Sequence, residues 1–206
     1  MSSLQVILVD AGTGNLHSVH NALLRLGADV NVTDDPAVVR SGGRIILPGV
    51  GAFGHFMTGI QQHGLVEVLG EIFQRGDPLL GICVGMQALF QSSEEMGEHP
   101  GLGFLTGRVL RFSNQPGLKV PHTGWNQLWP QTPSNLLTGL SAGSYAYFNH
   151  AYYCAPAAEE DVLALTDYGA SFASIVQRQN LYGVQFHPEK SQRVGLKILE
   201  NFIRYS

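Results

Sequence analysis

The residues in this sequence best suited to covalent chemistry surround Cys83. Gly81-Ile82-Cys83-Val84-Gly85 has the pattern G-x-C-x-G, and it joins an apolar run, Pro78–Ile82, to a helical pattern over Val84–Ser92. A nucleophile on such a tight turn has strained backbone geometry, so the residues two positions away must be small. The start of a helix also favours the thiolate, the reactive form of cysteine. The alternative is a buried structural cysteine between two packing glycines, because cysteine is among the most buried residue types.

A candidate base, His187, ends the apolar run Leu181–His187 and is followed by Pro188 and Glu189. Pro188 favours an extended conformation at His187, in which residues two apart point to the same side. Glu189 could then accept the Nδ1 proton and leave Nε2 facing a thiol, as a nucleophilic cysteine requires. Taken in isolation, H-P-E is more typical of a histidine in a surface turn.

A third segment, Leu47-Pro48-Gly49-Val50-Gly51, also ends an apolar run. The glycines on either side of Val50 would let backbone N–H groups turn toward an oxyanion, with the Val84 N–H as the second donor. By itself this is an ordinary Pro-Gly turn. Because nucleophile, base and oxyanion donors all fall at the ends of predicted strands, their coincidence favours one hydrolytic site.

The elements that must position these residues alternate between strand and helix in the first half of the chain. A continuous apolar run predicts a strand at Leu4–Asp10, and further strands are expected at Val30–Thr33, Arg44–Leu47 and Pro78–Ile82. Helical spacing predicts one helix capped by Asn15 and stopped by Gly27, and a longer helix over Phe53–Arg75. This order predicts a parallel, doubly wound sheet whose ligands bind at the carboxyl ends of the strands.

The second half of the chain is richer in short strand patterns. They cover Arg108–Phe112, Asn126–Trp129, Tyr145–Tyr153, Val162–Thr166, Ala173–Arg178 and Leu181–His187. A hairpin is expected at Gln179-Asn180, and a closing helix at Ser191–Tyr205. The sequence therefore predicts an α/β fold with a single doubly wound, mostly parallel sheet, flanking helices and an antiparallel elaboration in the second half. Residues 1–206 are expected to form one domain.

Composition excludes several other classes of function. The net charge is −4, without a Lys/Arg cluster longer than two residues, so neither nucleic acid nor an anionic membrane is an expected partner. Cys83 and Cys154 form no disulfide framework, which favours a reducing cytoplasm. Gly12-Thr13-Gly14 lacks the third glycine of a dinucleotide loop, and the histidines lack the spacing of metal ligands. No cofactor and no metal are therefore expected.

Segments along essentially the whole chain resemble the class I, or triad, glutamine amidotransferases. They are Asp10–Val19, Pro48–Phe53, Gly81–Phe90, Val120–Asn126, Tyr147–Tyr153 and Gly183–Gln192. Within that family, P-H-x-G-W-N and H-P-E-K-S-Q-x-x-G-L look most similar to the glutaminase subunits of histidine biosynthesis. The resemblance implies hydrolysis of L-glutamine to glutamate and ammonia through a cysteine thioester. The alternatives are a subunit serving another synthase (anthranilate, aminodeoxychorismate or pyridoxal phosphate) and a non-catalytic scaffold with the same fold.

The resemblance also implies roles for individual residues. Cys83 would be the nucleophile, His187 the base and acid, and Glu189 the residue that orients His187. Residues expected to hold glutamine are Gly51, Gln87 and the backbone of Ala151 and Tyr152. Residues expected to face a synthase partner are Asn15, Trp125, Tyr147 and Lys190.

That partner would be a (β/α)₈ barrel that forms a heterodimer with this chain and receives ammonia through a protected passage. Gly49 and Val50 would flip to complete the oxyanion hole, so that glutaminase activity depends on the partner. The chain departs from the family pattern of Tyr, Met, Val and Ser or Thr at Ala11, Thr123, Asn149 and Ala151, respectively. The change at Ala151 removes a hydroxyl near the expected glutamine pocket but leaves the backbone donor.

Overall fold

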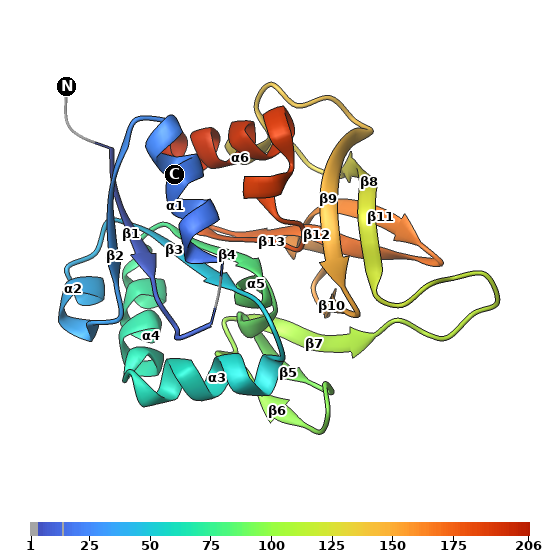
Figure 1. Ribbon diagram of the computed structural model, residues 1–206, viewed down its shortest axis with the longest axis horizontal. Coiled ribbons are helices and arrows are strands. Elements are labelled where there is room, and N and C mark those ends of the chain that lie inside the picture. Colours follow the sequence, from blue (N-terminus) through green and yellow to red (C-terminus); the bar gives the residue numbers. More distant parts are fainter. Residues whose placement is uncertain (1–3, 14) are drawn as a thin grey trace.

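A nine-stranded sheet forms the centre of the computed structural model, which describes residues 4–13 and 15–206 (Figure 1). The strand order is β2-β1-β3-β4-β13-β12-β11-β8-β9. The parallel part contains β1 (Leu4–Val9), β2 (Ala28–Thr33), β3 (Arg44–Gly49), β4 (Leu79–Cys83) and β13 (Leu181–Val184). The antiparallel part adds β8 (His122–Pro130), β9 (Ser144–His150), β11 (Val162–Tyr168) and β12 (Ala170–Arg178). The predicted α/β class is confirmed; Gly14 of the rejected dinucleotide loop lies outside the described residues.

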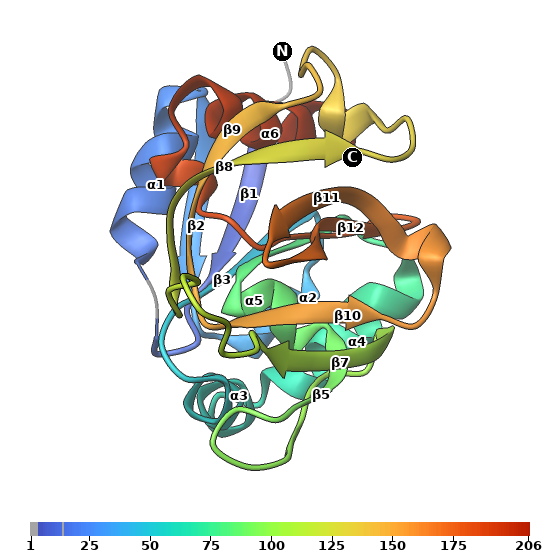
Figure 2. The same cartoon turned by 90° about the vertical axis from the view of Figure 1, so that its right-hand side faces the viewer.

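Helices cover both faces of the parallel strands, which explains the continuous apolar runs in β1, β3 and β4, whereas the edge strand β2 is partly exposed. Figures 1 and 2 show α1 (Leu16–Arg25) and α6 (Gln192–Tyr205) on one face, and α3 (Phe53–Gln62) and α4 (Leu65–Arg75) on the other. Every residue of β4 is buried. Among the described residues, the helices lack the length and apolar character needed to cross a bilayer.

A second, four-stranded sheet, which the sequence analysis did not anticipate, packs next to the first. Its order is β10 (Tyr152–Pro156), β7 (Leu105–Arg111), β5 (Phe90–Ser93) and β6 (His99–Pro100). The predicted helix over Val84–Ser92 is wrong, because α5 covers only Val84–Ala88 before the chain enters β5. Gly101 packs closely against β5: a Cβ there would lie 2.1 Å from the carbonyl oxygen of Phe90.

Two further predicted elements are each divided in the structure. The helix predicted over Phe53–Arg75 breaks after Gln62, because Gly64 adopts a left-handed φ of 66° between α3 and α4. The strand predicted over Tyr145–Tyr153 divides at Ala151 into β9 and β10, which belong to different sheets. This division turns the chain from the central sheet into the wall of the candidate site.

The N-terminus of α1 also differs from the prediction. Asn15 is the N-cap residue, but its side chain makes no capping hydrogen bond. Its backbone carbonyl instead accepts hydrogen bonds from the N–H groups of Ser18 and Val19, at 3.2 and 3.4 Å. The amide side chain of Asn15 is therefore free of a helix-capping role.

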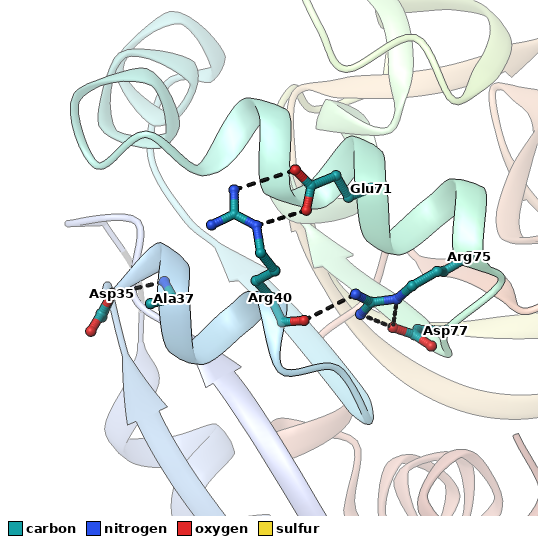
Figure 3. A network of polar contacts seen from close by, with 6 residues as sticks. All are labelled: Asp35, Ala37, Arg40, Glu71, Arg75 and Asp77. Atoms are coloured by element: carbon teal, nitrogen blue, oxygen red, sulfur yellow. Dashed lines mark hydrogen bonds and ion pairs between the residues drawn. The ribbon is translucent and has the colours of Figure 1, made fainter.

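A short helix that the sequence analysis did not predict, α2 (Pro36–Arg40), is fixed to α4 by polar contacts (Figure 3). Asp35 caps it, accepting a hydrogen bond from the Ala37 N–H at 2.8 Å. Arg40 donates to Glu71 at 2.7 Å, and Arg75 donates to the Arg40 carbonyl at 3.0 Å. These groups are exposed to solvent, so the Arg40–Glu71 ion pair contributes little to stability.

The approach to His187 combines a hairpin, an extended segment and a turn. The predicted hairpin at Gln179-Asn180 is confirmed by the pairing of Arg178 with Leu181. β13 ends at Val184, three residues before the predicted end, although the Gln185 and His187 N–H groups still donate to Ser174 and Tyr147 carbonyls. Short 3₁₀ turns occur at Asn135–Leu137, Glu159–Asp161 and Pro188–Lys190.

Candidate active site

The nucleophile turn lies where the carboxyl ends of neighbouring parallel strands meet. β4 pairs with β3 on one side and with β13 on the other, and Gly49 is the register partner of Cys83. Cys83 has φ 55° and ψ −110°, a conformation that costs a non-glycine residue about 1–3 kcal/mol. The predicted strained turn is therefore present.

The glycines around Cys83 are required by close backbone contacts. A Cβ on Gly85 would lie 1.8 Å from the carbonyl oxygen of Leu47, and a Cβ on Gly81 would lie 2.6 Å from that of Gly85. The turn is thus packed against β3 with no room for larger residues. The electrostatic contribution of the helix dipole at Cys83 is smaller than predicted. The reason is that α5 has only five residues and so few aligned peptide dipoles.

His187 and Glu189 form a buried pair. His187 Nδ1 lies 3.0 Å from Glu189 Oε1, and the side chains are 5% and 1% exposed. His187 itself is extended, as predicted from Pro188, but Pro188–Lys190 forms a 3₁₀ turn, so the predicted extended segment carrying both side chains on one side is wrong. Within this turn the carboxylate reaches back to Nδ1 of the ring, and the Lys190 N–H donates to the His187 carbonyl at 3.0 Å.

The protonation of His187 is set by opposing effects. Burial lowers the pKa of His187, but interactions with Cys83 and Glu189 outweigh burial and raise the pKa to about 10. An imidazolium between a thiolate and a carboxylate is the charge arrangement that a cysteine nucleophile requires. The site can therefore keep His187 protonated beside Cys83 at neutral pH.

A cavity of about 470 Å³ opens above Cys83. It is lined by the predicted catalytic, oxyanion and glutamine-binding residues Val50, Gly51, Cys83, Val84, Gln87, Ala151, Tyr152 and His187. Glu189 lies behind His187. Two residues predicted to face a partner, Asn15 and Lys190, line the same cavity, whereas Trp125 and Tyr147 do not. Trp125 and Tyr147 instead make an edge-to-face contact with each other, with ring centroids 5.9 Å apart.

Glu95 is a cavity residue that the sequence analysis missed. Its carboxylate accepts a hydrogen bond from the Phe53 N–H, the first residue of α3, at 2.6 Å. This contact holds a negative charge in the wall of the cavity. The only signal in the sequence is the acidic pair that follows β5, and β5 itself was mistaken for helix. Among the described residues, no cluster of three or more His, Cys, Asp and Glu side chains is arranged to hold a metal.

This combination of fold and site is that of a cysteine hydrolase on an open α/β sheet, and comparison with known proteins narrows the class. The model of the glutamine amidotransferase class-I family matches residues 7–205. The chain therefore belongs to the class-I glutamine amidotransferase family.

Curated relatives place the chain more closely within the family. The imidazole glycerol phosphate synthase subunit HisH of Moorella thermoacetica is 51% identical over 197 residues, covering 96% of this chain and 93% of that protein. The HisH subunit of Aquifex aeolicus is 46% identical over 202 residues, covering 98% and 97%. The structure of PurLQS from Thermotoga maritima superposes with a TM-score of 0.76 over 100% of this chain and 99% of that one. At 19% identity, that likeness concerns the fold alone.

These matches confirm the predicted enzyme, a glutamine amidotransferase. They also confirm the predicted place of the chain among the glutaminase subunits of imidazole glycerol phosphate synthase in histidine biosynthesis. The subunits of other synthases, considered above as alternatives, are less well supported.

Proposed function

We propose that this chain hydrolyses glutamine at Cys83 and delivers the ammonia to a synthase subunit. The observation that carries the proposal is the position of His187, buried between Cys83 and the Glu189 carboxylate beside the cavity. That arrangement supplies a thiolate, a proton donor and a fixed ring orientation within one site.

The reaction proceeds in two halves. Cys83 Sγ attacks the carboxamide carbon of glutamine, and the backbone N–H groups of Val50 and Val84 hold the resulting oxyanion. His187 gives its proton to the departing nitrogen, so that ammonia leaves and a γ-glutamyl thioester remains. His187 then takes a proton from water, hydroxide attacks the thioester, and glutamate leaves as Cys83 returns to thiolate.

The cavity wall supports a binding mode for glutamine. The Gln87 amide nitrogen already donates to the Tyr152 carbonyl at 3.0 Å and to Gln185 Oε1 at 3.3 Å, so its oxygen is the atom left to accept from substrate. The backbone of Gly51, Ala151 and Tyr152 provides further polar groups. Glu95 adds a negative charge suited to the α-ammonium group of an amino acid.

A partner subunit would complete the site, and the subunit names of the relatives support its existence. We assign to it the (β/α)₈ barrel and heterodimer that the family resemblance implies. Trp125 is 46% exposed, as an interface aromatic would be before docking. A partner resting on Asn15 and Lys190 would cover the cavity and retain ammonia. A flip of Gly49 and Val50 on docking would complete the oxyanion hole.

The organisation of the chain fits one glutamine amidotransferase domain over residues 1–206, since the family model spans 7–205 and one hydrophobic core joins the helices to both sheets. Both cysteines are unpaired, in keeping with work in the cytoplasm.

The replacement Cys83→Ala tests the proposal. With the matching synthase subunit and its ribotide substrate present, glutamine-dependent synthesis should fall by about 10⁴-fold or more, because the nucleophile is gone. Ammonia-dependent synthesis should persist. Cys154→Ala, at a buried thiol that does not line the cavity, is the matched control and should retain glutamine use. A Cys83→Ala enzyme that still uses glutamine would refute the mechanism.

A further inference from the structure

Behind the cavity, buried polar side chains form a continuous series of hydrogen bonds that ends at Cys83. Its members, Gln87, His122, His150 and Gln185, are 3%, 3%, 6% and 0% exposed. Gln185 and His122 do not line the cavity and take no part in the mechanism above. A buried polar network is costly unless each member is satisfied, so the pattern of donors and acceptors is informative.

One branch of the network reaches the nucleophile through Gln185. Its Nε2 donates to Cys83 Sγ at 3.8 Å, and its Oε1 accepts from Gln87 Nε2 at 3.3 Å. Gln87 Nε2 also donates to the Tyr152 carbonyl at 3.0 Å, which identifies it as the nitrogen. A nitrogen on Gln87 requires the oxygen of Gln185 to face it, so the Gln185 nitrogen faces the sulfur.

The second branch reaches the same Tyr152 carbonyl through the histidines. A carbonyl can only accept, so His150 Nδ1, at 2.8 Å, must carry a proton. In a neutral ring, His150 Nε2 then accepts from His122 Nδ1, at 3.1 Å. His122 Nε2 in turn accepts from Asn126 Nδ2, at 3.3 Å. Asn126 is itself oriented, because its Oδ1 accepts from the Gln127 N–H at 2.8 Å.

The surroundings keep both histidines neutral. Burial lowers the pKa of His122 to about 4. Burial also lowers the pKa of His150, to about 3, although its bond to Tyr152 acts in the opposite direction. Phe148 and Tyr168 stack on the His122 ring, with centroids 4.8 and 3.9 Å away. Every proton between Asn126 and the Tyr152 carbonyl therefore has one possible position.

We propose that Gln185 is a positioning residue for the nucleophile: its amide donates to Cys83 Sγ and favours the thiolate, and the oriented series from Asn126 to the Tyr152 carbonyl holds that amide in place. The inference rests on the proposed role of Cys83. A donor strengthens its bond as the sulfur gains negative charge, so it favours thiolate over thiol. A glutamine amide also carries no titratable proton, so it supports the thiolate without competing with His187 as the acid.

The first test is the pH dependence of Cys83 alkylation by iodoacetamide, followed peptide by peptide so that Cys154 is counted separately. In Gln185→Met, which keeps the size but removes the donor, the rate at pH 7 should fall about tenfold, and the rising limb of the profile should move to higher pH. In complex with the synthase, kcat should fall by a similar factor while KM for glutamine changes less than about threefold.

Ser174→Ala is the matched control. Ser174 is buried on β12 next to Gln185, and its hydroxyl donates to the Ala164 carbonyl at 3.2 Å, away from the sulfur. This variant should lose stability but keep the wild-type alkylation profile. A folded Gln185→Met protein with the wild-type profile would overturn the inference.

The second test needs no substitution at Gln185. Nitrogen-15 spectra of the histidine rings in the wild-type protein should show His122 and His150 as neutral Nδ1–H tautomers that do not titrate above pH 5. Either ring in the Nε2–H form, or titrating near pH 6.5, would refute the oriented series, whatever the fate of the Gln185 variant. Failure of the proposed function is distinguishable, because it would appear as glutamine use by Cys83→Ala, not as an unchanged Gln185→Met.

Discussion

Three histidines beside the same cavity are almost equally buried, yet they differ in charge. His187, His122 and His150 are 4%, 3% and 6% exposed. Burial acts to lower the pKa of each. At His187 the cysteine and carboxylate partners reverse this effect and raise the pKa to about 10. His122 and His150 hydrogen-bond only to neutral groups, so burial lowers their pKa values to about 4 and 3, and the charge of His187 acts in the same direction on His150. Burial alone therefore does not decide protonation here, because a charged partner can override it.

The difference follows from the part of the sheet that supplies each region. The triad region gathers residues from the ends of parallel strands, where side chains from distant segments meet at one edge of the sheet beside the cavity. His122 and His150 are direct cross-strand partners on the antiparallel β8–β9 ladder, which puts their rings edge to face, with centroids 5.1 Å apart, under an aromatic cover. The triad region is suited to stabilising charged side chains. The β8–β9 region is suited to fixing the positions of neutral ones.

The largest expected effect comes from removing the carboxylate charge beside His187, so that this ring, like those of His122 and His150, lies next to a neutral hydrogen-bond partner. Glu189→Gln keeps the size of the orienting side chain but removes its charge. Glutamine hydrolysis in the complex should fall about 10³–10⁴-fold, as when the orienting carboxylate of other triads is replaced by an amide. The pKa of His187, followed by NMR titration, should fall toward the range of the neutral pair.

Glu200→Gln is the control for this substitution. Glu200 lies on α6, where it pairs with Lys197 and Arg204 at 3.1 Å at the surface. Its replacement should leave hydrolysis unchanged. Wild-type activity in Glu189→Gln would show that the carboxylate does not determine the protonation of His187.

The triad region was much easier to predict from the sequence than the histidine pair. The turn around Cys83 and the H-P-E segment are local patterns, and the alternation of strands and helices indicates that their ends meet. Contact between His122 and His150 depends on the register of two strands 28 residues apart, which no local pattern encodes. Gln185 lies in a recognised segment, but its partner Gln87 is 98 residues away.

Errors in the predicted elements have a similar origin. Helical spacing continues across Gly64, so the break between α3 and α4 is visible only as a glycine whose φ the sequence does not reveal. The chain leaves α5 early and enters the second sheet, where β5 pairs with β6 and β7 and Gly101 packs against the Phe90 carbonyl. Glu95 was missed for the same reason, since its place in the cavity wall depends on that sheet. Tertiary packing, not local propensity, decided each of these features.

A second prediction separates the two regions by pH. A histidine that stays neutral when folded costs stability wherever the unfolded chain takes up a proton, below about pH 6.5. The His122–His150 region should therefore lose stability as pH falls from about 6.5 toward 4 and then 3. For the deeply buried His150 the loss is about 1.4 kcal/mol per pH unit. The raised pKa of His187 has the opposite sign: its contribution is complete below about pH 6.5 and is lost as pH rises toward about 10.

Urea unfolding from pH 4.5 to 9.5 would measure both limbs. Replacing His150 by Asn should lower stability at pH 7 and flatten the acid limb, while Glu189→Gln should flatten the alkaline limb. If His150→Asn left the acid limb as steep as in the wild type, burial of this histidine would not be the cause of the stability lost at acid pH.

The smallest expected effect concerns the outer face of the β8–β9 ladder. Thr123 and Asn149 are cross-strand partners next to the His122–His150 pair, and Thr123 Oγ1 donates to Asn149 Oδ1 at 3.0 Å. Both side chains are exposed, and both positions depart from the family pattern described above. A double-mutant cycle with Thr123→Val and Asn149→Val should give a coupling free energy of about 0.2–1 kcal/mol in urea unfolding.

The same cycle on the buried face, with His122→Asn and His150→Asn, should give a larger coupling, because each single change leaves a buried ring nitrogen without its partner. Equal coupling on the two faces would mean that the ladder register, and not the buried series of hydrogen bonds, holds the histidines together. A larger coupling on the buried face would assign that role to the hydrogen bonds themselves, since both pairs share one backbone register and differ mainly in their exposure to water.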